Sequence, residues 1–554
     1  SLSLSLFLSL SPSLSISLSL FLFTLSLSLS LSLSLPVSSS SSPSPLPVLV
    51  LVHGDSFSWG GGGAFNGTTL AAAGQIIVVT LNYRLGPYGF LGRCESSSCS
   101  GNVAISDLVT ALQMLSAILP AFGGSHREIT LMGWGAGAAI VSLLMASPLT
   151  APANRRLFAR AILLDGTALA PWALSNDPQG VFLQLAEKLG CLPSRNGSSN
   201  PLNEGIESYA RCMQDHSAAN VTRAADAIDV PTFMNAFAPI IDGRFVVNKP
   251  SHLFSPSFGS LFREIDLLVG TVSQPAHHLL PNGDLHGMHR EQREKILRTL
   301  IRNLYDFHRT EILAATLNEY TDWNQPKENG RAVRDSVLGA LSDALFTSPL
   351  VETLRAHSSD ETRREATTYF FHFGHETRGW SSRPERAAAG VHGAVSGDLL
   401  PYALGYPLSA RAAGGAARDE QLYSEFSADD VGMSRVLMHY IASFVKHGDP
   451  TKQPMQRESQ MEERFASIAW PQFSQPNREA YLDISRSDER KVSVRNFYRN
   501  AHVAFWSGLV PQLHVNGREG VAVPEEHHQL PGHFREDSFF GRVRPYGGHS
   551  NLPF

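Results

Sequence analysis

The sequence predicts an α/β fold with a mostly parallel central sheet flanked by helices. Continuous apolar runs end in turns, as strands buried on both faces of a parallel sheet do. A stretch with helical spacing lies between two of these runs, and alternation of strands and helices is typical of a doubly wound sheet. The 554 residues are 43% hydrophobic and 17% charged, which is sufficient for a large core.

Four segments are predicted to be strands of this sheet. They are "PVLVLVHG" at 47–54, "GQIIVVTLNYRLG" at 74–86, "EITLMG" at 128–133 and "RAILLDG" at 160–166. Between the second and third, "AISDLVTALQMLSAILPAFGG" has leucines at helical spacing and closes on proline and glycine, which predicts a helix.

Three further helical segments are predicted downstream. Residues 294–320 form a helix or helix pair, and residues 425–447 form a helix with a cap-like start from Ser427 to Asp430. Residues 495–514 form the last helix. Beyond it the chain is polar and rich in Gly, Pro and His, so residues 515–554 are interpreted as a flexible tail or juxtamembrane-type linker.

Residues 1–45 are a low-complexity Ser/Leu tract. A repeated CT dinucleotide encodes Ser-Leu in every frame, so we interpret the tract as translated repeat DNA and leave it out of the predicted fold. A signal peptide would have a basic start, but the first Lys or Arg is Arg84. A membrane span is disfavoured because about every second residue is serine.

Charge and cysteine usage limit the class of protein. A net charge of -5 without a basic stripe argues against nucleic acid as a partner. The four cysteines suit either two bridges in a large secreted domain or four free thiols, and N-x-[ST] sequons favour an oxidising, glycosylating compartment. The cysteines are Cys94, Cys99, Cys191 and Cys212, and the sequons begin at Asn66, Asn196 and Asn220.

The turn from Gly133 to Gly137 has the frame of a hydrolase nucleophile elbow, G-x-S-x-G, with Gly135 in place of the serine. The same residues also satisfy a dinucleotide fingerprint, G-x-G-x-x-[GA], with Asp165 as the ribose ligand. That acidic residue is about 30 positions away rather than the usual ~20, and the bulky Trp134 lies in the turn, so a nucleotide-binding α/β protein is only an alternative.

The stretch "LVHGDSFSWGGGG" contains a second catalytic-type turn. A His-Gly-Gly turn supplies backbone N–H groups to the oxyanion hole of esterases, but here Asp55 follows Gly54. A carboxylate at this place opposes a developing negative charge, so the oxyanion turn formed by Gly54, Asp55 and Ala136 is interpreted as degenerate. The histidine pairs 277–278 and 527–528 lack metal-ligand spacing, and no metal site is predicted.

Together these segments resemble the carboxylesterase/cholinesterase family of α/β-hydrolases, and within it the neuroligins. The resemblance implies an α/β-hydrolase domain over residues 46–514 that lacks the family's N-terminal strands. It also implies a disulfide between Cys191 and Cys212, while the pairing of Cys94 with Cys99 is left open. Matching stretches in family order include "VHG", "VTLNYRLGPYGFLG", "RAILLDGTALAPWA", "FAPIIDG", "YTDW", "GDLLPYALG", "FVKHGDP" and "VAFWSGLVPQLH".

The resemblance identifies three triad positions, and all three are replaced. Gly135 stands for the serine, Pro275 in "GTVSQPA" for the acid, and Ser396 in "SGDLLPY" for the histidine. A triad works only as a unit, so the resemblance implies a protein that is not an enzyme. The enzyme alternative is a divergent carboxylesterase with a displaced nucleophile.

The resemblance implies a cell-surface adhesion receptor in the postsynaptic plasma membrane. Its domain is extracellular, binds presynaptic neurexin with calcium at the contact, and needs no other cofactor. The resemblance also implies a membrane anchor, which this chain does not show, and a homodimer built on a four-helix bundle. The candidate dimer residues are Leu297, Ile301, Tyr305, Phe505, Leu509 and Leu513.

Overall fold

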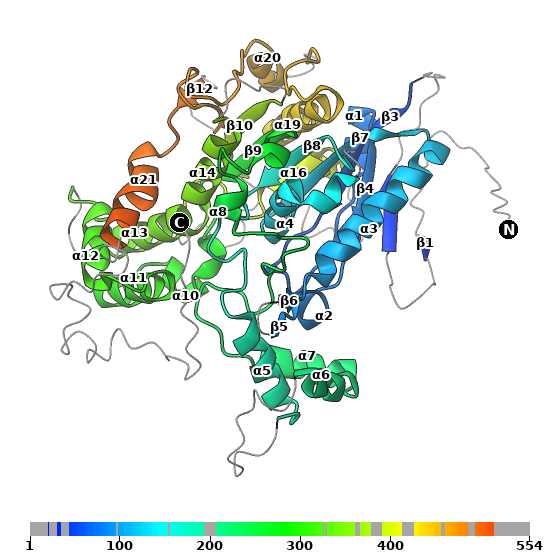
Figure 1. The fold of residues 1–554 in the computed structure, drawn as a ribbon. Coiled ribbons are helices and arrows are strands. Elements are labelled where there is room, and N and C mark those ends of the chain that lie inside the picture. Colours follow the sequence, from blue (N-terminus) through cyan, green and yellow to red (C-terminus); the bar gives the residue numbers. More distant parts are fainter. Residues whose placement is uncertain are drawn as a thin grey trace, which may run out of the picture.

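The computed structural model describes most of the chain between residues 44 and 514 (Figure 1). The described ranges are 20–21, 30–34, 44–95, 98–152, 156–192, 206–324, 326, 329–359, 366–377, 390–412, 426–455, 460–485 and 493–514. The sequon at Asn196 and the tail 515–554 therefore lie outside the described residues.

A ten-stranded sheet forms the centre of the fold, in the order β1-β2-β4-β3-β7-β8-β9-β10-β11-β12. The strands from β4 to β11 are parallel, and antiparallel pairs occur only at the two ends. The predicted α/β-hydrolase class is confirmed. The strands are β1 Leu20–Phe21, β2 Ser30–Ser34, β3 Leu46–Val52, β4 Ile77–Leu81, β7 Gly124–Trp134, β8 Arg160–Leu164, β9 Asp266–Val272, β10 Thr368–Phe373, β11 Ala480–Ile484 and β12 Ser493–Asn496.

The Ser/Leu tract takes part in this sheet, contrary to its exclusion from the predicted fold. Residues Ser30–Ser34 pair antiparallel with β4, and Leu20–Phe21 pair with them in turn. The physical reason is that strict alternation of Ser and Leu has the two-residue period of a strand. The predicted domain start at residue 46 is therefore too late, because β1 and β2 precede it in this sheet.

Helices cover both faces of the sheet. Helices α3 and α4 contribute to one core, and α1, α16 and α19 contribute to the other. The predicted cap of α19 is a capping box between Ser427 and Asp430. The helices named above are α1 Thr68–Gly74, α3 Val103–Ile118, α4 Ala136–Ala146, α16 Leu399–Leu404 and α19 Ala428–His447. Further helices of this part of the chain are α2 Gly86–Phe90, α17 Tyr406–Ala412 and α20 Gln460–Ala466, and the short α8 Pro250–Leu253, α9 Ser260–Arg263 and α10 Asn282–Leu285.

A small helical lobe projects below the sheet in Figure 1. It has its own apolar cluster and consists of α5 Pro178–Lys188, α6 Ile206–Gln214 and α7 Ala218–Asp226. The structure joins Cys191 to Cys212 within this lobe. It also joins Cys94 to Cys99 across the hairpin of β5 Arg93–Glu95 and β6 Ser98–Ser100. The sequon residues Asn66 and Asn220 are both exposed, as glycosylation requires.

A group of helices at the other end of the sheet contains the last helical segment (Figure 1). The predicted pair at 294–320 is α11 Arg290–Leu304 and α12 Arg309–Glu319. Next come α13 Gly330–Ser342, a π-helix η7 Asp343–Thr347 and α14 Ser348–His357. The chain ends its described part with α21 Asn500–Ala504, a π-helix η9 Phe505–Leu509 and α22 Val510–His514.

Four of the predicted dimer residues are wrong as surface contacts. The side chains of Leu297, Ile301, Tyr305 and Phe505 are at most 5% exposed and pack in the core of this one chain. The apolar stripe that suggested them is covered by neighbouring helices of the same molecule. Leu509 differs, because 45% of it is exposed, and Leu513 is partly buried against the core.

Among the described residues, two helical stretches are long and apolar enough to cross a membrane, Val103–Phe122 and Gly330–His357. Both belong to the folded domain. In the apolar window of the second stretch, 89% of the residues are buried inside the structure. In the window of the first stretch 50% of the residues are buried, as in a helix that packs with one face on the sheet. We therefore assign the second stretch to the core and the first to the helices that cover the sheet.

Candidate functional site

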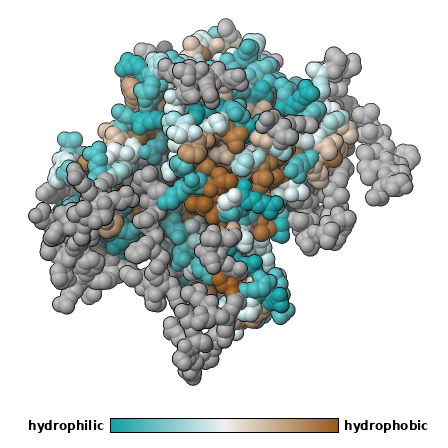
Figure 2. Space-filling model, viewed as in Figure 1, coloured by the Kyte–Doolittle hydropathy of each residue, from teal (hydrophilic) through white to brown (hydrophobic). Residues whose placement is uncertain are grey.

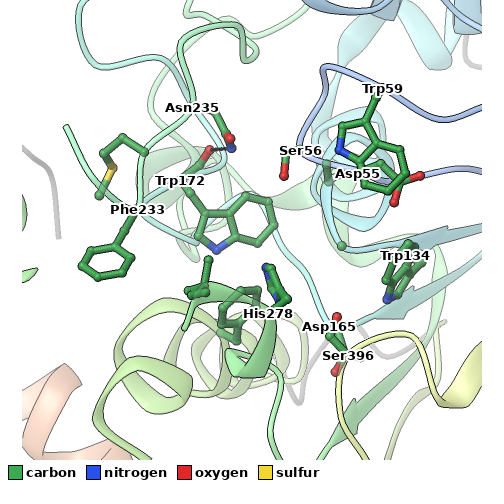
Figure 3. A pocket seen from close by; sticks show the side chains of 15 residues that line it. Asp55, Ser56, Trp59, Trp134, Asp165, Trp172, Phe233, Asn235, His278 and Ser396 are labelled. Carbon is green, nitrogen blue, oxygen red and sulfur yellow. Dashed lines mark hydrogen bonds between the residues drawn. The ribbon is translucent and has the colours of Figure 1, made fainter. Parts of the chain in front are cut away.

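A cavity of about 420 Å³ lies at the carboxyl ends of β3, β7 and β8. Strand β3 pairs with β4 on one side and with β7 on the other, so the chain reverses its direction of winding here. Such switch points are where open α/β sheets bind ligands. The lining residues include Asp55, Trp59, Trp134, Gly135, Ala136, Asp165, Trp172, Phe346 and Ser396 (Figure 3).

The elbow keeps the backbone of a nucleophile turn without a nucleophile. Gly135 has φ 53° and ψ -118°, a strained conformation for a residue with a side chain. A Cβ on Gly133 would come within 2.4 Å of Gly137, and one on Gly137 within 2.2 Å of the Val52 carbonyl oxygen. A Cβ on Gly135 would meet nothing within 4 Å. The outer glycines are needed for strand and helix to pack, whereas the middle position has room for a side chain.

The turn after β3 presents a carboxylate to the same cavity. Asp55 and the next two residues all have positive φ, between 55° and 73°. Burial raises the pKa of Asp55 to about 6. An oxyanion site needs N–H donors directed at the developing charge, and a carboxylate here works against that requirement.

The three predicted triad positions lie on loops that approach one another. Gly135 and Ser396 line the same cavity. Pro275 is buried and does not line it, but the preceding Gln274 forms a parallel bridge with Val395. The loop after β9 and the loop that carries Ser396 are therefore side by side. Neither proline nor serine can serve as the acid or as the base of a triad at these places.

Asp165 is the most perturbed acid of the cavity. It directly follows β8, is 1% exposed and has a left-handed backbone with φ 51°. Its Oδ1 accepts bonds from the Val272 amide at 2.9 Å and from the Thr271 hydroxyl at 3.1 Å. Burial raises the pKa of Asp165 to about 7 despite these two bonds. The sequence indicated this residue only as a ribose ligand in the nucleotide alternative.

The Asp165→Asn variant is expected to change how stability depends on pH. The pKa of Asp165 is about 7 in the folded chain against 3.8 ordinarily, so the folded state holds the proton more tightly. Ionisation of Asp165 therefore lowers the free energy of unfolding as pH rises from about 4 to about 7. Urea unfolding across this pH range should show a smaller fall in the free energy of unfolding for the variant than for the wild type. Parallel curves for variant and wild type would contradict the assignment, and Asp429→Asn, at an exposed residue of α19, is the control.

A second Ser–His–Asp arrangement occurs outside this cavity. Ser273 Oγ lies 3.0 Å from His372 Nε2, and His372 Nδ1 lies 2.9 Å from Asp483 Oδ1. Ser273 directly follows β9, His372 lies in β10 and Asp483 lies in β11. These three strands are neighbours in the sheet. Although burial raises the pKa of Asp483, hydrogen bonds from His372 and Ser485 and the charge of Arg495 hold it below its usual value. Sequence reasoning missed this set because its members are far apart in the chain.

The carboxylesterase family model matches residues 27–506, which include the elbow, the oxyanion turn and all three triad positions. The chain belongs to the carboxylesterase family. Its elbow glycines are therefore part of an esterase scaffold, which disfavours the dinucleotide-binding alternative.

Within the carboxylesterase family, the chain is similar to neuroligins. It is 58% identical over 504 residues to Neuroligin-1 of Caenorhabditis elegans. The aligned region covers 91% of this chain and 61% of the relative. It is 32% identical over 470 residues to Neuroligin-2 of Mus musculus and 31% identical over 476 residues to Neuroligin-3 of Homo sapiens. The chain covers 51% and 50% of those two relatives, so it spans about half to three fifths of the relatives' length.

Proposed function

We propose that this chain is the extracellular domain of a non-catalytic, neuroligin-type adhesion receptor that binds neurexin in synapse organisation. One observation carries the proposal. The elbow turn retains its strained backbone at Gly135 but has no nucleophile, in a chain that is 58% identical to a neuroligin. The scaffold has been kept and the reactive group has not.

The other catalytic positions support the same conclusion. Ser396 and Pro275 take the places that the resemblance assigns to the base and the acid, and Asp55 opposes an oxyanion. Several concordant replacements on separate loops are better explained by loss of the chemistry than by one isolated change. The folded surface then serves binding, and its place is the postsynaptic plasma membrane.

The proposed contact with neurexin includes calcium. Among the described residues, the grouping with metal-like spacing is Cys191, Cys212 and His216, but its two cysteines form a disulfide. Calcium prefers six to eight oxygen ligands, which this group does not offer. In our proposal the partner supplies part of the calcium coordination at the shared contact.

Cell aggregation tests the adhesion proposal. Cells that display this domain should aggregate with cells that display neurexin, and a calcium chelator should disperse them. Cells with an unrelated carboxylesterase-family domain on their surface are the control. Equal aggregation by both, or no response to chelation, would contradict the proposal.

We further propose a homodimer in which the last helical segment forms part of the interface. Leu509 is the exposed large apolar residue of this segment, at the end of η9. In a two-fold interface the same surface patch of both copies takes part, so an exposed apolar residue of that patch is buried twice. Of the six predicted dimer residues, Leu509 is the one proposed for this interface, because four of the others are buried in the core of one chain.

The Leu509→Arg variant is expected to be monomeric at concentrations where the wild type is dimeric. The substitution would bury an unpaired charge in the interface in each of the two copies, so we expect the dimer dissociation constant to rise about 30-fold or more. Sedimentation equilibrium measures this change. Phe258→Arg, at a residue that is 59% exposed between α8 and α9, is the control and should leave the dimer intact. An unchanged dissociation constant for Leu509→Arg would remove this segment from the interface.

A second candidate function is hydrolysis through a displaced nucleophile, and the Ser273–His372–Asp483 set favours it. A fluorophosphonate would react by forming a bond from Ser273 Oγ to phosphorus, with fluoride leaving and His372 taking the proton. The backbone of Gly393 argues against this function because it lies close to the Ser273 hydroxyl. A Cβ added to Gly393 would be 2.5 Å from Ser273 Oγ.

Labelling with a fluorophosphonate probe, followed by peptide mapping, distinguishes the two functions. The adhesion proposal predicts no labelled serine, because the nucleophile of the elbow is absent and the half-buried Ser273 has the Gly393 backbone close to its hydroxyl. A label on Ser273 that disappears in Ser273→Ala would establish the second candidate instead. An active carboxylesterase is the positive control.

A further inference from the structure

A second cavity, of about 100 Å³, lies where helices α11 and α13 begin. Its walls include Arg290 at the first position of α11, the segment 321–323 that follows α12, and Ala332 in the first turn of α13. The Met288 amide donates to the Gly330 carbonyl at 2.9 Å, so the two helix starts are held side by side. Figure 1 shows these helices together at one end of the sheet, away from the elbow cavity.

Two arginines line this cavity, and one of them is buried. Arg293 is 7% exposed, and its Nη1 donates to the Thr321 hydroxyl at 3.1 Å. That hydroxyl donates in turn to the Leu317 carbonyl, which fixes the guanidinium in place. Nε of Arg293 is closed off without a partner in the described part of the chain, whereas Nη2 has no such partner and is not closed off from solvent. Nη2 is therefore the donor that Arg293 can offer to a ligand.

The second arginine, Arg290, is exposed. Burial and the nearby charge of Arg290 lower the pKa of Arg293. Two like charges, one of them largely removed from water, are unfavourable unless an anion compensates them.

The carboxylates of the described residues nearby do not compensate this charge. Asp322 lines the cavity, but it is exposed and its Oδ1 accepts from a backbone amide of its own turn. Glu294 is exposed and pairs with Arg298 one helical turn on. Glu291 is exposed and does not line the cavity. Because a buried guanidinium normally has a paired charge, its absence here indicates a place for an anion from outside the chain.

The helix starts and the size of the cavity narrow the ligand class. The first turn of α11 has no capping side chain, so its N–H groups and its dipole favour an anion. The start of α13 is capped by Asn329 and adds only its dipole. Figure 2 shows the larger hydrophobic areas near the centre of the view and not at the end that carries α11 and α12. Pockets for drug-sized molecules are roughly 300–1,000 Å³, so this smaller cavity suits a small polar group.

We propose that this cavity binds one doubly charged tetrahedral oxyanion, a sulfate or phosphate group. Its oxygens accept from Arg290, from Nη2 of Arg293 and from the first turn of α11. Arginine donors form strong charge-assisted hydrogen bonds to such oxygens. A doubly charged anion neutralises both arginines, whereas a carboxylate neutralises one of them. The cavity shares no residue with the elbow cavity, and the proposal does not depend on the adhesion function.

Calorimetric titration of the full chain with three anions at matched ionic strength tests this proposal. The probes are inorganic sulfate, methyl phosphate and acetate at about pH 8, where a phosphate monoester with a second pKa of about 6 carries two charges. Sulfate should bind roughly tenfold more tightly than acetate. Equal affinity for sulfate and acetate, or no binding of sulfate, would overturn the proposal.

Methyl phosphate identifies the source of the oxyanion. If it binds as sulfate does, the site accepts an esterified group of a larger molecule. If sulfate alone binds, the ligand is a free ion. Either result supports the proposed oxyanion site.

Three variants locate the anion. Arg293→Met should abolish sulfate binding. Arg290→Gln changes an exposed residue and should weaken binding about fivefold even if Arg293→Met proves unstable. Lys295→Gln, at an exposed residue of α11 that does not line the cavity, should leave the affinity unchanged. Full affinity in Arg290→Gln would place the anion elsewhere and contradict the proposal.

A fourth variant, Glu328→Gln, tests whether a carboxylate of the chain takes this place instead. Glu328 comes just before α13 in the sequence and lies outside the described residues. The proposal predicts the same sulfate affinity for this variant and for the wild type. Sulfate binding that occurs only in Glu328→Gln would show that the chain fills the cavity itself, and would overturn the proposal.

Discussion

Replacing Arg499 by methionine is expected to lower the free energy of unfolding by about 3 kcal/mol, because it leaves a buried carboxylate without its counter-ion. Asp343 is fully buried at the start of η7. Both of its oxygens accept from the Arg499 guanidinium, each at 2.6 Å. The Tyr320 hydroxyl also donates to Asp343 at 2.7 Å. We place the effect at the lower end of the usual range because Arg499 is 35% exposed.

Urea unfolding of the variant and of two controls measures this effect. Arg211→Met removes a surface cation, 77% exposed, from an i,i+4 pair and should cost less than about 0.5 kcal/mol. The double variant Asp343→Leu/Arg499→Met removes both charges and should recover much of the loss. If Arg499→Met is no worse than Arg211→Met, this ion pair does not hold the last helical segment to α13 and η7.

Restoring the missing hydroxyl with Gly135→Ser is expected to destabilise the domain and to produce no esterase activity. The space is available, but φ 53° and ψ -118° strain a residue with a side chain by about 1–3 kcal/mol. The new serine would find Ser396 and Pro275 where a base and an acid are needed. Without a base to take its proton, serine is a weak nucleophile.

Thermal or urea unfolding and turnover of a chromogenic ester measure the two parts of this prediction. Gly63→Ser, at an exposed glycine with open space and no positive φ, is the control for stability. Measurable hydrolysis by Gly135→Ser would show that a base is still present near the elbow. It would contradict the view that the chemistry was lost at several positions.

Much of the fold follows from local patterns in the sequence. Apolar runs that end in turns identified β3, β4, β7 and β8, because a strand buried on both faces has no polar alternation. The cap at Ser427 was equally local, since a capping box involves residues three apart. The elbow at Gly133–Gly137 could be predicted because, at each outer glycine, another part of the backbone comes too close for a side chain.

Other features depend on contacts that no local pattern records. Helical spacing at Leu297 and Ile301 showed an apolar face but not that helices of the same chain cover it. The environment of Asp165 includes a hydrogen bond from the amide of Val272, 107 residues away in the chain. The composition of the Ser/Leu tract led to its exclusion from the predicted fold, although its two-residue period suits the two strands that it forms, β1 and β2.

The central claim is that an esterase scaffold without its nucleophile serves as a binding surface. Surface plasmon resonance of the immobilised ectodomain with a soluble neurexin domain tests it most directly, in calcium and then in chelator. We predict saturable binding in calcium that is lost in chelator and retained in Ser273→Ala. Absence of binding to every neurexin domain, with no other cell-surface ligand, would contradict the claim.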